Sequence, residues 1–289
     1  MWPENHCARQ FLGNWCTWVN TGSRCILTVA AAPSTCTRLI VGETGRCRRS
    51  SSGISTSRSP IEGGHCAAII SAGPPGAGKS TALREHDLVD TSYRYLDADI
   101  VKDELLRRAI ADGHYADLLS TTLADAHPIA PRELAALVHA ESTEVIDDVR
   151  EVCLQRRENV VIEGTLQWGP LGGILMAQLS EHDYTDVRIV DVEVPASIAH
   201  EQAVRRWWEG RLRGISGQDR MGGRFTPPAA IARLYETGSV SRCAAHARAA
   251  FESSLAAAIT QVTLIHIDRR LGAEPLVSRR VDGKLVEGR

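Results

Sequence analysis

Residues 73–80 carry the residue types that bind nucleotide phosphates. The segment Gly-Pro-Pro-Gly-Ala-Gly-Lys-Ser fits the pattern G-x-x-x-x-G-K-[ST] in full. Glycines let successive backbone N–H groups surround phosphate oxygens, and the helix that follows adds partial positive charge. Lys79 is one of only three lysines in the chain, so it is significant in a motif that does not admit arginine. The predicted nucleotide-binding residues are Gly73, Pro74, Pro75, Gly76, Ala77, Gly78, Lys79, Ser80 and Thr81.

The same pattern predicts that the nucleotide binds with a metal ion. In such loops the lysine reaches the β- and γ-phosphates, and the serine hydroxyl ligates Mg²⁺. We therefore expect Lys79 to act on the phosphates and Ser80 to be a metal ligand.

Acidic residues follow two short apolar runs. Asp97 and Asp99 come after Tyr95-Leu96, and a carboxylate there can accept the proton of an attacking hydroxyl. One of the two can instead cap the helix that begins near Ile100, so we assign the functional role to Asp99. Glu163 ends the run Val-Val-Ile-Glu, where it can hold Mg²⁺ through water, grip the substrate, or be a surface residue.

A third segment, residues 205–224, combines arginine with glycine. Arginine is always charged and grips phosphate in a bidentate manner, so an arginine-rich segment with glycine hinges is typical of a lid over a triphosphate. About half of these arginines are expected to lie on a solvated helix face instead. The segment contains Arg205, Arg206, Arg211, Arg213, Arg220 and Arg224.

The elements around these segments predict an α/β fold. Apolar runs predict strands at 67–72, 95–96, 159–162, 187–194 and 262–267. Between them, helices are expected after Lys79 and at 100–111, 131–156, 172–182, 197–213, 228–236 and 242–259. This alternation is typical of a mainly parallel sheet flanked by helices, as in P-loop kinases, with the arginine segment as a lid.

Composition narrows the function classes. The net charge is −2 and aromatic residues make up only 5% of the chain, which argues against nucleic-acid binding. No run of 18 apolar residues occurs, so we expect no membrane span and a cytoplasmic protein.

Residues 1–60 are predicted to be a poorly ordered extension, and residues 61–289 the catalytic domain. Six of the eight cysteines fall within residues 1–66, but they show no Cys-x-x-Cys spacing. Two alternatives to a poorly ordered extension are a redox or metal element and a small folded cap.

Several motifs in order resemble the zeta toxin family. They are the phosphate loop, Asp-Ala-Asp-Ile-Val-Lys at 97–102, and Asn-Val-Val-Ile-Glu-Gly-Thr-Leu at 159–166. Val194-Pro195, Arg206-Trp207 and the segment Arg-Phe-Thr-Pro at 224–227 extend the similarity, which covers about residues 63–270.

The resemblance implies an ATP- and Mg²⁺-dependent kinase that phosphorylates the 3′-hydroxyl of UDP-N-acetylglucosamine and so inhibits peptidoglycan synthesis. Asp99 would then be the general base, Arg206 and Arg224 would clamp phosphates, and Glu163 and Thr165 would face the sugar nucleotide. A further substrate-binding glutamate is expected on the preceding helix. We assign it to Glu144, with Glu141 as the alternative. A separate antitoxin is the implied protein partner.

One position departs from the family pattern. Some members carry arginine two residues after the threonine, where this chain has Gln167. Two other functions remain open at this stage: a different P-loop kinase acting on a small molecule or a polynucleotide, and a nucleotide-dependent switch or ATPase. The absence of Asp-x-x-Gly after a strand counts against a switch.

Overall fold

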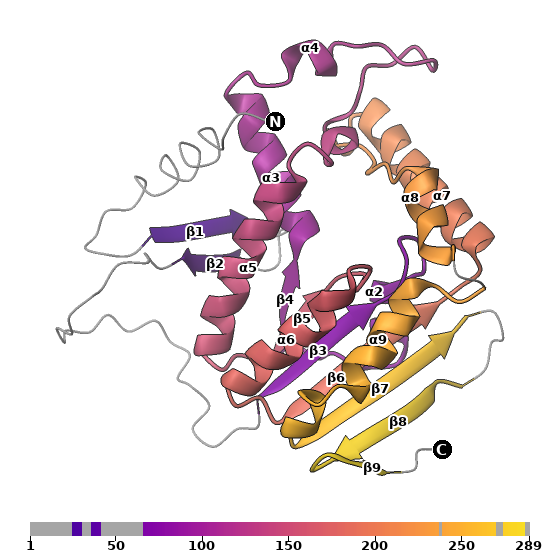
Figure 1. Ribbon diagram of the computed structural model, residues 1–289. Helices are drawn as coiled ribbons and strands as arrows, with labels where there is room; N and C mark the ends of the chain where they lie inside the picture. Colours follow the sequence, from indigo (N-terminus) through magenta and orange to yellow (C-terminus); the bar gives the residue numbers. More distant parts are fainter. Residues whose placement is uncertain (1–24, 31–35, 42–65, 237–238, 270–273, 287–289) are drawn as a thin grey trace, which may run out of the picture.

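The central element of the structure is a seven-stranded sheet. The computed structural model describes residues 25–30, 36–41, 66–236, 239–269 and 274–286 (Figure 1). The sheet has the order β4-β5-β3-β6-β7-β8-β9. Its strands are β3 (Ala67–Ala72), β4 (Arg94–Asp97), β5 (Val160–Glu163), β6 (Asp186–Glu193), β7 (Gln261–Asp268), β8 (Leu276–Val281) and β9 (Lys284–Val286).

The first five strands of this order are parallel, and the last two are antiparallel. Strand β3 pairs with β5 on one side and β6 on the other, so the segment that follows β3 emerges at the middle of the parallel part. Because the carboxyl ends of parallel strands lie at one edge, the loops after β3, β4 and β5 are neighbours there. The five predicted strands of the parallel sheet are confirmed, but β8 and β9 were not predicted.

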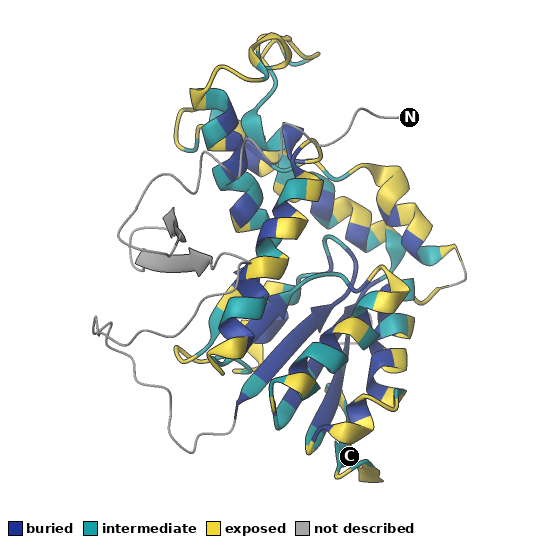
Figure 2. Ribbon diagram, turned by 60° about the vertical axis from the view of Figure 1, so that its left-hand side comes forward, coloured by how far each residue is buried: buried dark blue, intermediate teal, exposed yellow. Residues whose placement is uncertain are grey.

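Helices cover both faces of the sheet (Figure 1). The helices are α2 (Lys79–Glu85), α3 (Ala98–Ala111), α4 (Ala116–Leu119), α5 (His139–Gln155), α6 (Gly169–Glu181), α7 (Ala196–Ile215), α8 (Pro228–Ala232) and α9 (Arg242–Glu252), with 3₁₀ turns η1 (Pro131–Leu134), η2 (Arg233–Tyr235) and η3 (Ala256–Ala258). Figure 2 shows the strands buried between helices whose outer sides are exposed.

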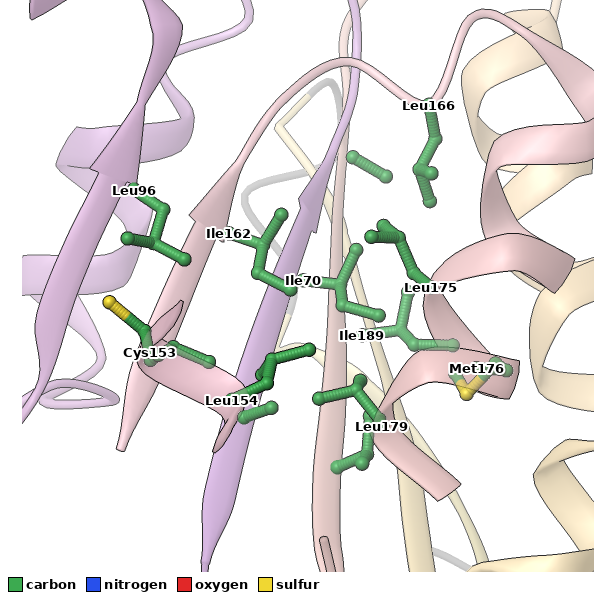
Figure 3. Packing of buried hydrophobic residues seen from close by; sticks show 14 of the residues in the cluster. Ile70, Leu96, Cys153, Leu154, Ile162, Leu166, Leu175, Met176, Leu179 and Ile189 are labelled. Atoms are coloured by element: carbon green, nitrogen blue, oxygen red, sulfur yellow. The ribbon is translucent and has the colours of Figure 1, made fainter. Parts of the chain in front are cut away.

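Two apolar clusters form the core, one on each face. Neighbouring residues of a strand point to opposite faces, so Ile70 packs with one cluster and Ile69 with the other. On the Ile70 face, Leu154 of α5 and Leu175 of α6 pack against the sheet (Figure 3). The Ile69 face is covered by α2, α7 and α8, which contribute Leu83 among others. Full burial of each such side chain stabilises the fold by about 1.5–3 kcal/mol.

The predicted helix at 131–156 is wrong in its first turns. Residues Pro131–Leu134 form a 3₁₀ turn, and α5 begins only at His139. The cause is tertiary. The backbone N–H of Arg132 donates to the Met221 carbonyl at 2.9 Å, and the Glu133 carboxylate accepts from the Ala130 N–H at 2.8 Å. The first bond fixes the turn against a distant segment, and the second closes the turn locally.

The predicted extension at residues 1–60 lies mostly outside the described residues. Within it, β1 (Cys25–Ala30) and β2 (Cys36–Val41) form an antiparallel pair. The boundary near residue 60 therefore stays a prediction. Among the described residues, no helix is both long and apolar enough to cross a membrane.

Candidate active site

The phosphate loop connects β3 to α2, as the sequence predicted. Gly73 and Gly76 have φ values of 132° and 85°, which L-residues with a side chain rarely adopt. Space adds a second constraint, because a Cβ on Gly73 would collide with the Val192 carbonyl and one on Gly76 with the Ala199 carbonyl. The loop is therefore packed closely against β6 and α7, and only glycine fits at these two positions.

Lys79 lies partly buried within this loop. Its ammonium donates to the carbonyl oxygens of Gly73 at 3.1 Å and Pro74 at 3.3 Å. Desolvation lowers the pKa of Lys79; Arg206 acts in the same direction, whereas Glu163 and Cys243 oppose it. A cation held in this way gains a strong partner when anionic phosphate oxygens arrive.

Ser80 and Glu163 are paired across the loop. The Ser80 hydroxyl donates to Oε1 of Glu163 at 2.7 Å, because β5 lies directly beside β3. An alcohol oxygen next to a carboxylate is a set of hard oxygen donors that fits Mg²⁺, which in kinases keeps several waters and takes few protein ligands. The described residues contain no cluster of three His, Cys, Asp or Glu side chains that could hold a metal, and a magnesium site of this kind does not need one.

Asp97 and Asp99 have different roles at the start of α3. Asp97 is the N-cap, and its carboxylate accepts from the Asp99 N–H at 2.8 Å, so one of the two carboxylates caps the helix, as predicted. The functional role of Asp99 stays a prediction. Burial, and then repulsion by Asp99, raises the pKa of Asp97 to about 6. Asp97 also lies in register with Glu163 on the next strand.

The Asp99 side chain is 43% exposed and surrounded by cations. It forms ion pairs with Arg224 and with Lys102, the latter at 3.0 Å. Burial raises the pKa of Asp99, but the charges of Arg224 and Lys102 outweigh this effect, so the pKa lies below its ordinary value. The carboxylate is therefore ionised at neutral pH, as a proton acceptor must be.

Arg224 reaches this place from the segment after α7. One side of its guanidinium faces Asp99, and Nη2 donates to Oδ1 of Asp103 at 2.6 Å and to the Asp99 carbonyl at 3.1 Å. Arg132 contacts the same carboxylate of Asp103. The Arg224 side chain is only 15% exposed, so these contacts hold it in a partly desolvated position.

The other arginines of the segment divide into three kinds. Arg206 is exposed on α7, close enough to lower the pKa of both Lys79 and Asp99. Arg211, in contrast, is 2% exposed and binds Asp125, Glu133 and two backbone carbonyls, which is a structural role. The remaining arginines of α7 and the turn after it are exposed: Arg205, Arg213 and Arg220.

On the expected substrate side, Thr165 lies beside the loop, and its carbonyl accepts from the Gly73 N–H at 3.2 Å. The exposed Gln167 donates its N–H to the Thr165 hydroxyl at 3.3 Å. Glu144 is exposed, whereas Glu141 is half-buried, with an Oε2 that is shielded from solvent and has no hydrogen-bond partner in the described part of the chain. A shielded carboxylate oxygen without a partner makes Glu141 the better candidate for a ligand contact.

Sequence reasoning missed the residues that hold the site together. Asp103 follows Asp99 by four positions, a spacing that places two side chains on one face of a helix and that could have been used as a signal. Arg132 and Glu133 gave no such signal, because their partners lie far away in the sequence.

Comparison with solved structures finds distant similarities, all at low sequence identity. The PezAT chromosomal toxin–antitoxin system of Streptococcus pneumoniae is 14% identical, with 70% of this chain and 67% of that chain covered and a TM-score of 0.46. Two structures of AvrRxo1-ORF1 with AvrRxo1-ORF2, one with sulphate ions and one with ATP, are each 12% identical, with TM-scores of 0.48 and 0.44. Each covers 78% of this chain, which spans 61% of the AvrRxo1 chain.

A search of curated proteins found no match. A comparison with protein-family models gives the classification. The Zeta toxin model matches residues 54–269, well over half of the sequence, and includes every residue of the site described above. The chain belongs to the Zeta toxin family.

Proposed function

We propose that this protein is an ATP-dependent kinase that phosphorylates the 3′-hydroxyl of UDP-N-acetylglucosamine and thereby inhibits peptidoglycan synthesis. The observation that carries the proposal is the position of Asp99. Its carboxylate, kept ionised by Arg224 and Lys102, lies at the sheet edge that also carries the phosphate loop. A base beside a nucleotide site suits transfer to a hydroxyl group.

The nucleotide side of the reaction uses the loop. The backbone N–H groups of residues 76–80, which follow the two prolines of the loop, and the Lys79 ammonium would bind the β- and γ-phosphates of ATP. Ser80 and Glu163 would hold Mg²⁺, the latter directly or through water. When bound, the metal neutralises charge on the phosphate oxygens.

The acceptor side uses the carboxylate and the arginines. Asp99 takes the proton of the acceptor hydroxyl as its oxygen attacks the γ-phosphorus. The bond from that phosphorus to the bridging oxygen breaks, and ADP leaves with the electron pair. Arg206 and Arg224 would stabilise the negative charge on the phosphoryl group in flight. Glu163 and Thr165 line the same edge, and Glu141 replaces Glu144 as the proposed acceptor-binding glutamate of α5.

We further propose that residues 61–289 are the catalytic domain, that the protein acts in the cytoplasm, and that a separate antitoxin binds it. The substrates ATP and UDP-N-acetylglucosamine are both cytoplasmic metabolites. Membership of the Zeta toxin family supports the proposal of an antitoxin partner.

The test is a panel of acceptors with ATP and Mg²⁺. The arms are UDP-N-acetylglucosamine, UDP-glucose, an oligonucleotide with a free 5′-hydroxyl, and no acceptor, each measured by ADP release and by product mass. We expect a UDP-N-acetylglucosamine product heavier by one phosphoryl group, with the phosphate placed at the 3′-oxygen by ³¹P–¹H NMR.

Each other outcome points to a different function. Product from the oligonucleotide alone would identify a polynucleotide kinase. ADP release that is equal with and without acceptor would identify an ATPase. The Lys79→Ala variant serves as the control for contaminating kinases in every arm.

A further inference from the structure

Asp103 lies one helical turn after Asp99 on α3, and both carboxylates contact Arg224. Asp103 is 15% exposed, and its carboxylate binds two guanidinium groups. Oδ1 accepts from Arg224 at 2.6 Å. Both oxygens accept from Nε of Arg132, at 3.1 and 2.9 Å, and Nη2 of Arg132 lies 2.8 Å from Oδ2. The carboxylate therefore separates and neutralises two partly buried cations.

Arg132 extends this contact to the segment that carries Arg224, residues 219–224. Its backbone N–H donates to the Met221 carbonyl at 2.9 Å, and Nη1 donates to the Gly222 carbonyl at 2.8 Å and to Asp219 at 2.5 Å. Asp103 thus joins α3 to this segment in two ways, directly through Arg224 and indirectly through Arg132.

We propose that Asp103 is a positioning residue that fixes the Arg224 guanidinium beside the base Asp99 and beside the path of the transferred phosphoryl group. The proposal rests on the proposed kinase function and adds to it a residue that does not itself touch the substrates. Asp99 cannot perform this task alone, because its carboxylate has to be free to take a proton. Asp103 provides a second carboxylate that does not react.

The physical reason lies in the geometry of a shared guanidinium. Arg224 contacts Asp99 through Nη1 and Asp103 through Nη2, so the two carboxylates define both the position and the plane of the group. Without Asp103, Nη2 keeps only the longer bond to the Asp99 carbonyl at 3.1 Å, so the guanidinium is held less firmly. A displacement of about 1 Å at a catalytic group can cost on the order of 10²-fold in rate.

The kinetic test is a double-mutant cycle. Asp103→Asn should lower kcat by about 10- to 100-fold, with the KM for ATP nearly unchanged. In the Arg224→Ala background, Asp103→Asn should cause no further loss of kcat, because the group it positions is absent. The matched control is Glu104→Gln at the next position, a partly exposed residue that pairs with Arg107, and it should leave kcat unchanged.

Two results would overturn the proposal: a parent-like kcat in Asp103→Asn, or equal losses of kcat in the parent and Arg224→Ala backgrounds. If Asp103→Asn does not fold, Asp103→Glu takes its place in the same cycle. It keeps the charge but moves the carboxylate by one methylene, so its loss of kcat should also vanish in the Arg224→Ala background.

Urea unfolding tests the contact without any substrate. Asp103→Asn should lower the unfolding midpoint more in the parent than in Arg224→Ala, where only the Arg132 contact is left to lose. Equal shifts in both backgrounds would refute the inference even if the parent turned over normally. Conversely, if the parent transfers no phosphate but the shift in midpoint is still larger in the parent than in Arg224→Ala, the proposed function is refuted and the positioning contact stands.

Discussion

The phosphate loop and the Arg224 segment both contribute to the candidate active site, but different interactions fix their positions. The loop is fixed by backbone geometry between two consecutive elements, β3 and α2, and Lys79 bonds to carbonyls of the loop itself. The Arg224 segment is fixed by charged side chains of distant residues. Its partners Asp103 and Arg132 are 121 and 87 residues away from Arg224 and Asp219, respectively.

The difference predicts how each region responds to change. A backbone cradle keeps its shape when a functional side chain is removed, so loop variants should lose chemistry but not stability. A charge network loses its shape when one member is removed, because the remaining partly buried charges have no partner. Variants of the Arg224 segment should therefore lose both activity and stability.

The largest effect is expected at Lys79. Lys79→Ala removes the cation that faces the phosphates and should lower kcat by about 10³-fold or more. The melting temperature should not fall, because desolvation already disfavours this charge in the folded state. Steady-state kinetics and differential scanning calorimetry measure the two effects. Activity equal to that of the parent would remove the kinase proposal, and a clear loss of stability would contradict the view of the loop as a backbone cradle.

Asp99→Asn comes next. Asparagine keeps the size of the side chain but cannot accept the proton, so phosphoryl transfer should slow by about 10²-fold or more. Binding of ATP and UDP-N-acetylglucosamine, measured by calorimetry, should stay near that of the parent. Asp97→Asn is the matched comparison at the same helix start. If Asp97→Asn abolishes turnover while Asp99→Asn does not, the base is Asp97.

The same contrast explains what the sequence could predict. The loop and the five parallel strands were predictable because each depends on short segments: an apolar run, a glycine pattern, a helix start. The cap role of Asp97 was predictable for the same reason. The 3₁₀ turn at 131–134, the buried Arg211 and the network around Asp103 were not, because they depend on partners that lie 29 to 121 residues away. Strands β8 and β9 were missed because none of their residues is buried and they show no apolar run.

The third prediction separates Arg224 from Arg206. Either change to alanine should lower kcat by about 10²-fold, more than it weakens ATP binding. Only Arg224→Ala should also lower the melting temperature, because Asp103 and Asp99 lose a partly buried partner.

The pH profile gives a second readout of the same contrast. Arg224 lowers the pKa of Asp99 more than Arg206 does. The acid limb of the kcat/KM profile should therefore move to higher pH in Arg224→Ala, and less in Arg206→Ala. If both variants change only the KM for ATP, the two arginines bind ATP in the ground state and do not stabilise the transition state.

The fourth prediction tests the metal role of Glu163. Glu163→Gln keeps an oxygen that can accept from Ser80 but removes the negative charge. The Mg²⁺ concentration for half-maximal activity should rise by about 10- to 100-fold, and Ser80→Ala should act in the same direction. Titration of activity with Mg²⁺ at saturating ATP measures this. An unchanged Mg²⁺ requirement with a raised KM for UDP-N-acetylglucosamine would instead place Glu163 on the acceptor.

The smallest effect concerns Asp97 and the pH dependence of stability. Burial raises the folded-state pKa of Asp97 to about 6, above its ordinary value of 3.8. The folded state therefore binds more protons than the unfolded state between these values, and ionisation of Asp97 reduces stability as the pH rises through this window.

Asparagine caps a helix as well as aspartate does, so Asp97→Asn keeps the cap and removes the buried charge. The variant should match the parent in free energy of unfolding near pH 4 and become relatively more stable as the pH approaches 6 and above. Urea unfolding at a series of pH values measures the difference, with Asp112→Asn, at the other end of α3, as the control. A difference that does not change with pH would show that Asp97 titrates normally and that its carboxylate is well solvated.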